Sequence, residues 1–233
     1  MTKNTKEFNI ILAVDSTYMN ESFWSSLTSD YAPFLTKSFE EMGTEVSKQF
    51  VCYTRQDRED GVQASPWLSA QHKELQKFAD SVKGFPCDFD LPEIFRYALL
   101  AAEQRPLHGL VIFAATQKQR SKGKSIESEI RPLAQRLKAM GVTVFIFDNA
   151  DEYNLVSSHI SSQFDKASMW ANGLHVSFHS ENLRTLYEYM KLIGPVVAGD
   201  LGALKKQSGD LITVHGNHLF RKCILRLDPA GRK

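Results

Sequence analysis

Oxygen-bearing side chains follow directly after the first apolar run of the chain. The run "FNIILAV" (residues 8–14) is followed by Asp15, Ser16 and Thr17. A carboxylate with neighbouring hydroxyl groups supplies the oxygen ligands that Mg²⁺ prefers in proteins. The same residue types also cap helices, because their side chains accept hydrogen bonds from the free amides of the first turn. The motif therefore indicates either a magnesium site or a helix N-cap at the end of a buried strand.

Further polar groups stand next to two later elements. The segment "CDFDLPE" carries Asp88, Asp90 and Glu93 just before an apolar helical pattern, and Thr116 follows a second apolar run, "HGLVIFAA". Ligands of open α/β sheets bind at the carboxyl ends of the strands, so we expect these groups near Asp15. A basic loop comes next, which could receive an acidic protein, a phosphate or a nucleic-acid backbone, or could simply be solvated. Its cations are Lys118, Arg120, Lys122 and Lys124.

The elements that must position these groups alternate along the chain. Three continuous apolar runs, at 8–14, 108–115 and 141–147, are typical of parallel strands covered on both faces. The segment 45–54 alternates like an edge or half-exposed strand, and 172–193 predicts a short strand and an amphipathic helix. Helices are predicted at 23–43 (kinked or split by Pro33), 69–82, 92–104 and 125–141. The alternation predicts a doubly wound, mostly parallel α/β sheet with helices on both faces.

The chain changes character after residue 193. We expect one α/β domain at 8–193 and a C-terminal extension at 194–233. Within the extension, "GDLITVHGNHLFRKCILRL" (209–227) has two strand-like runs around "HGNH", where Gly and Asn both tolerate positive φ. A β-hairpin in the extension is therefore predicted.

The strand-end motif resembles the first motif of the von Willebrand factor A (vWA) family, a Rossmann-like fold with a metal-ion-dependent adhesion site (MIDAS) at the top of its sheet. The family pattern is D-x-S-x-S, and "DSTYM" matches it at Asp15 and Thr17. Met19 stands at the third position, where a thioether is a poor ligand for a hard cation.

Two other segments resemble the same family, and one motif departs from it. "DFDLPEIFRYALLAAE" is similar to a segment of one branch of the family, and "LAQRLKAMGVTVFIF" matches its next helix and strand. The aspartate that the family carries after the next core strand is replaced by "AATQ". The resemblance covers about residues 8–193 and implies a degenerate or weak magnesium site, with Asp15, Thr17, Asp88 and Asp90 as the available ligands.

The resemblance implies a non-enzymatic interaction or scaffold module that binds a protein partner within a multi-protein assembly, with no cofactor required beyond a possible Mg²⁺. The partner would meet the strand-end face. On that face the expected contact residues are Ser16, Thr116, Lys118, Arg120, Lys122 and Lys124.

Two other classes of function stay open from the residues alone. A magnesium-dependent hydrolase or phosphotransferase could use Asp15 and Asp90, although the chain has no G-x-S-x-G, P-loop or GxGxxG motif. A nucleic-acid-associated module could use the basic loop and a basic tail. The cations of that tail are Lys205, Lys206, Arg221, Lys222, Arg226, Arg232 and Lys233.

Bulk properties favour a protein partner in a reducing compartment. The formal net charge of +1 gives no global field toward nucleic acid or membrane. The three cysteines, Cys52, Cys87 and Cys223, are scattered and lack CxxC spacing, which argues against a disulfide framework or a zinc site. The polar N-terminus lacks the pattern of a signal peptide, so we expect a cytoplasmic protein that does not enter a membrane.

Overall fold

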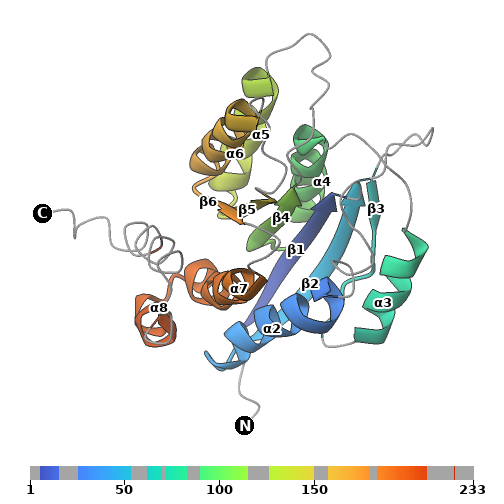
Figure 1. Ribbon diagram of the computed structural model, residues 1–233, viewed down its shortest axis with the longest axis vertical. Helices are drawn as coiled ribbons and strands as arrows, with labels where there is room; N and C mark the ends of the chain where they lie inside the picture. Colours follow the sequence, from blue (N-terminus) through green and yellow to red (C-terminus); the bar gives the residue numbers. More distant parts are fainter. Residues whose placement is uncertain are drawn as a thin grey trace, which may run out of the picture.

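The computed structural model describes residues 6–15, 26–53, 62–69, 72–82, 90–114, 126–149, 157–178, 183–208 and 223. In this part of the chain, six strands form one sheet in the order β3-β2-β1-β4-β5-β6 (Figure 1). Only β3 runs antiparallel to its neighbour. The strands are β1 (Glu7–Asp15), β2 (Glu45–Tyr53), β3 (Val62–Ala64), β4 (Gly109–Ala114), β5 (Thr143–Asn149) and β6 (Leu174–Phe178). The predicted doubly wound, mostly parallel α/β sheet is confirmed.

Helices cover both faces of the sheet (Figure 1). α4, α5 and α6 pack on one face, while η1, α2, α3 and α7 pack on the other. The helices are η1 (Leu27–Tyr31), α2 (Ala32–Glu40), α3 (His72–Ser81), α4 (Leu91–Gln104), α5 (Ile126–Ala139), α6 (Ser157–Trp170), α7 (Leu183–Ala198) and α8 (Leu201–Ser208). No helix of the described residues is long and apolar enough to cross a membrane.

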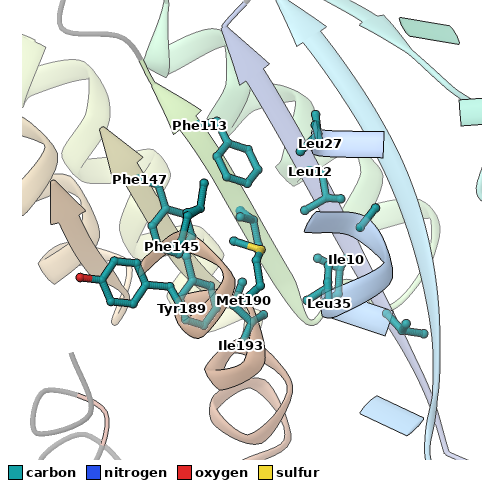
Figure 2. Close-up of a cluster of buried hydrophobic side chains, with 14 of the residues drawn as sticks. Ile10, Leu12, Leu27, Leu35, Phe113, Phe145, Phe147, Tyr189, Met190 and Ile193 are labelled. Atoms are coloured by element: carbon teal, nitrogen blue, oxygen red, sulfur yellow. The ribbon is translucent and has the colours of Figure 1, made fainter. Parts of the chain in front are cut away.

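Strand β1 divides its apolar side chains between the two cores. Ile10 and Leu12 belong to the core under α2 and α7, while Ile11 and Ala13 belong to the core under α4, α5 and α6. All four are buried, which explains why the run is continuous rather than alternating. In the first core, Tyr189, Met190 and Ile193 of α7 lie against the phenylalanines of β4 and β5 (Figure 2). Each such buried side chain contributes about 1.5–3 kcal/mol of transfer free energy.

Strand β2 corrects one prediction. Its alternating sequence indicated an edge or half-exposed strand, but β2 pairs with β1 on one side and β3 on the other. Ser47, Lys48 and Gln49 are all buried. Two of them make hydrogen bonds inside the fold: Lys48 Nζ donates to the Thr36 hydroxyl, and Gln49 Nε2 donates to the Ser65 carbonyl at 3.0 Å. The polar positions of β2 thus lie inside the fold and do not mark a solvent face.

In the described part of the predicted helix at 23–43, the bonding changes from π-helical to α-helical next to Pro33, where the sequence predicted a kink or a split. Residues Leu27–Tyr31 form the π-helical turn η1, and α2 follows without a break at Ala32. Proline has no amide hydrogen to donate, so the regular α-helical bonding pattern cannot run through residue 33. Gly43 adopts a φ of 69° after α2, a conformation that glycine tolerates at the end of a helix.

The C-terminal extension begins inside a helix. Residue 194, its predicted start, lies within α7, and α8 follows α7 directly. Leu204 of α8 and Cys223 are both fully buried in the same core as α7. The predicted hairpin at 209–227 lies outside the described residues apart from Cys223, so it stays a prediction. Burial of Cys223 in this core places this part of the extension against the domain.

Candidate functional site

The strand order places a topological switch point between β1 and β4. After β1 the chain adds β2 and β3 on one side of the sheet, and it then returns to place β4 on the other side of β1. β1 ends at Asp15 and β4 ends at Ala114, and the preceding residues Val14 and Phe113 are paired in register. Open α/β sheets bind ligands in the crevice at such a point. The described topology therefore puts the candidate site at the carboxyl ends of β1 and β4.

Most of the predicted site residues belong to segments that leave the sheet at this edge. Asp15 is the last residue of β1, and its backbone pairs with Tyr53 of β2. The prediction that these side chains meet in one site is not tested by the described residues. The residues that lie outside them are Ser16, Thr17, Asp88, Thr116, Lys118, Arg120, Lys122 and Lys124.

Asp90 is the one predicted ligand whose side chain is described, and it caps a helix. It has extended backbone geometry before α4, and its Oδ1 accepts a hydrogen bond from the Glu93 amide at 3.2 Å. Pro92 stands in the first turn, where its missing amide is not needed. Glu93 forms an ion pair with Arg96, which also lies 3.5 Å from Glu129 of α5. Since α4 leads into the start of β4, its capped N-terminus lies at the carboxyl edge of the sheet, where the site is expected.

Replacement of Asp90 separates its capping role from a metal role. We expect Asp90→Ala to lower the free energy of unfolding by about 1 kcal/mol, while Asp90→Ser keeps a capping oxygen and restores most of it. Denaturant unfolding with and without Mg²⁺ measures both effects. A magnesium-dependent gain in stability that both variants lose would identify the carboxylate as a ligand. An unchanged midpoint for Asp90→Ala would contradict the capping role.

The structure also brings together an acidic cluster that the sequence did not predict. Asp148 of β5 is fully buried, and its Oδ1 lies 3.1 Å from Nε2 of His175 on β6. Nδ1 of the same imidazole lies 3.5 Å from Oδ1 of Asp165 on the surface of α6. A buried carboxylate needs a polar neighbour, and the imidazole of His175 stands at that distance from Asp148. The only signal in the sequence is an aspartate at the end of the run "GVTVFIFD".

The register places this buried acid in line with the candidate site. Ala114 of β4 pairs with Asp148 of β5. Ala114 follows Phe113, Asp15 follows Val14, and Phe113 and Val14 are paired in register. Asp15 and Asp148 therefore lie in one row with β4 between them, about 10 Å apart at their Cα atoms. Among the described residues, no group of three or more His, Cys, Asp or Glu side chains could hold a metal ion. The predicted set Asp15, Thr17, Asp88 and Asp90 stays a prediction.

Comparison with solved structures identifies the fold. No protein-family model matches the sequence, and no curated protein matches it significantly. The VWA domain of SpRpn10 superposes with a TM-score of 0.53 at 14% identity, covering 78% of this chain and 94% of that one. The pilus adhesin SpaC from Lactobacillus rhamnosus GG gives a TM-score of 0.61 at 11% identity over 85% of this chain.

A third similar structure is the PilB minor pilin from Streptococcus sanguinis, with a TM-score of 0.55 at 10% identity over 85% of this chain. The chain spans only 31% of the SpaC chain and 63% of the PilB chain. At these identities the similarity concerns the fold alone. Strand order, helical layers and superposition agree: the chain has the fold of a von Willebrand factor A domain.

Proposed function

We propose that this chain is a non-enzymatic protein-interaction module of the vWA type, which binds its partner through the carboxyl ends of β1 and β4. The observation that carries the proposal is the switch point, where β1 ends at Asp15 beside the end of β4. The N-terminus of α4 lies at the same edge, and helix N-termini attract acidic groups. A partner with a carboxylate or another acidic group fits this edge together with the basic loop at 118–124.

The similar structures support a recognition role. One is named as an adhesin and another as the VWA domain of SpRpn10. The metal site would be weak, because Met19 and the segment "AATQ" stand where the family pattern carries oxygen ligands. Recognition would then depend on Asp15 and Thr17 as hydrogen-bonding groups, with a weakly held Mg²⁺ where one is present. We also propose a reducing, cytoplasmic setting, because the three cysteines lack the spacing of a disulfide framework.

The experiment tests which edge of the sheet captures the partner, with one variant at the carboxyl end of β1 and one at the amino end of β2. Immobilised wild-type protein is incubated with an extract of its own cells, with Mg²⁺ or with EDTA, and the retained proteins are quantified by mass spectrometry. We expect Asp15→Ala to lower the capture of the specific partner about tenfold, which corresponds to the loss of one strong interface contact. Glu45→Ala is the matched control, because Glu45 is an exposed acid at the amino end of β2.

The proposal predicts reduced capture by Asp15→Ala and unchanged capture by Glu45→Ala. Equal capture by wild type and Asp15→Ala, with a loss in Glu45→Ala, would move the interface to the other edge and contradict the proposal. Loss of capture in EDTA would show that the cation takes part. Capture that is the same in EDTA would show that Asp15 acts without a metal.

A further inference from the structure

A histidine side chain completes the hydrogen bonding between β1 and the segment before β4. The register of the two strands begins at Ile10 and Gly109. One residue earlier, the amide of His108 donates to the carbonyl of Asn9 at 2.9 Å. The amide of Asn9 in turn donates to Nδ1 of the His108 imidazole at 3.0 Å, across 99 positions of sequence. The imidazole therefore takes the place of a backbone carbonyl at the amino end of β1.

The surroundings hold this imidazole in place and bury its partner. Asn9 is buried, so its amide would be left unsatisfied if it lost this acceptor, which is costly. The side-chain amide of Asn9 donates to the carbonyl of Pro106 at 2.8 Å and so holds the same segment at a second point. The imidazole is in T-shaped contact with the ring of Phe8, with 5.0 Å between the ring centroids. Packing thus fixes where the acceptor nitrogen lies.

The hydrogen bond from Asn9 exists only while His108 is neutral. A neutral imidazole accepts through Nδ1 when its proton is on Nε2, whereas the imidazolium carries hydrogen on both nitrogens and only donates. Protonation would therefore set two N–H groups against each other. Burial is the main cause that lowers the pKa of His108 from 6.5; the charge of Lys6 lowers it further, Glu7 opposes the shift and Arg105 adds to it. In the described part of the chain, these three are the charged residues that act on the imidazole.

We propose that His108 is a pH-sensitive switch at the amino edge of the sheet: the neutral imidazole fastens the start of β1 to the segment before β4, and its protonation releases that start. The switch lies at the end of β1 opposite to Asp15 (Figure 1). It therefore goes beyond the proposed function and does not depend on it.

The direction of the switch follows from proton binding. Because the pKa of His108 is lower in the folded protein, the unfolded chain binds more protons between the folded-state pKa and 6.5. The stability that His108 contributes is therefore fully present above pH 6.5 and is lost as the pH falls through the folded-state pKa. The switch is closed at neutral pH and opens in acid.

Nuclear magnetic resonance of the full chain observes the switch directly. A hydrogen bond between two nitrogens gives a scalar coupling, here between the Asn9 amide and Nδ1 of His108. We expect this coupling at neutral pH, and its loss as the imidazole gains its second proton. Over the same titration, the hydrogen-exchange protection factor of the Asn9 amide should fall about tenfold, since one hydrogen bond is lost. The control is Phe50 of β2, whose amide also donates to a side chain, the Ser65 hydroxyl at 2.9 Å, which does not titrate.

The variant His108→Asn separates the hydrogen bond from the titration. The side-chain oxygen of asparagine reaches the position of Nδ1 and accepts a hydrogen bond, but it does not titrate. We expect protection of the Asn9 amide in this variant to match wild type at neutral pH and to stay the same in acid. His108→Ala should lose the protection at both pH values. In denaturant unfolding, wild type should lose stability relative to His108→Asn as the pH falls below 6.5.

Several results would overturn the proposal. One is a missing coupling between the Asn9 amide and Nδ1 at neutral pH. Another is unchanged protection of Asn9 while the imidazole titrates. An equal loss of protection in acid in wild type and His108→Asn would also overturn it, because other groups would then cause the opening. The wild-type titration decides the proposal by itself if His108→Asn does not fold.

Discussion

Substitution of Gly173 by alanine is expected to prevent stable folding of the domain. Gly173 lies between α6 and β6, and a Cβ built there would stand 1.9 Å from the carbonyl oxygen of Val144. Val144 is a buried residue of β5, so its carbonyl cannot move without disturbing the ladder between β5 and β6. The Gly173 amide also donates to the Ser168 carbonyl at 2.6 Å, which fixes the turn itself. We expect a loss of more than about 3 kcal/mol, above the usual cost of overpacking.

The measurement is denaturant unfolding of Gly173→Ala beside Gly202→Ala. Gly202 is an exposed residue of α8, where an added Cβ would stand 3.3 Å from the Asp200 carboxylate. Alanine favours the helix over glycine by roughly 0.5–1 kcal/mol, so the control should be neutral or stabilising. If Gly173→Ala unfolds at the wild-type midpoint, the close packing of α6 and β6 described here is wrong.

The parts of the fold that sequence predicts are those with one strong local signal. β1, β4 and β5 were recognised because apolar residues fill both faces of a covered parallel strand. α4 was recognised from its periodicity and from Pro92 in the first turn. β3 has only three residues and depends on β2 for its pairing, and α6 opens with serine and histidine rather than with strong helix formers. Tertiary contacts decide those two elements, so local patterns could not.

For the candidate site, too, some features could be predicted from local sequence and others depend on tertiary contacts. Its location depends on the strand order, which comes from the pairing of the strands in the folded sheet. The cap alternative concerned Asp15, Ser16 and Thr17, whereas it is Asp90, predicted only as a ligand, that caps a helix. The cluster around His175 could not be predicted, because Asp148 and Asp165 come from different elements and meet it only in the folded sheet. The hydrogen bond from the Tyr187 hydroxyl to Asp30 likewise joins residues far apart in the sequence.

Lys48 is a basic side chain buried inside the fold. It lies inside β2 with only 4% of its surface exposed, and its Nζ donates to the Thr36 hydroxyl of α2. Burial lowers the pKa of Lys48 from 10.5 to about 8, and the negative charge of Glu40 opposes this shift. The cause is desolvation: the interior disfavours the charged ammonium more than the neutral amine. Below pH 8 the Lys48 ammonium is therefore charged in the folded protein, and its burial lowers the free energy of unfolding.

The sign of the resulting pH dependence follows from proton binding. The folded-state pKa of about 8 lies below the unfolded-state value of 10.5, so the unfolded chain binds more protons between these pH values. Stability contributed by this residue therefore rises as the pH rises through 8 toward 10.5. The shift corresponds to about 3 kcal/mol, all of it a penalty at neutral pH.

Lys48→Met should remove this penalty. Methionine has a similar shape and no charge, and Thr36 keeps its own hydrogen bond to the Ala32 carbonyl at 2.9 Å. We expect the variant to be more stable than wild type by about 2–3 kcal/mol at neutral pH, with the difference shrinking toward pH 10. Denaturant unfolding of both proteins across this range measures the difference and cancels the titration of all other groups. Lys37→Met, at an exposed position of α2, should show no such pH dependence. A Lys48→Met variant that is less stable than wild type at neutral pH would mean that the ammonium is stabilised by its partners, and that its burial carries no net penalty.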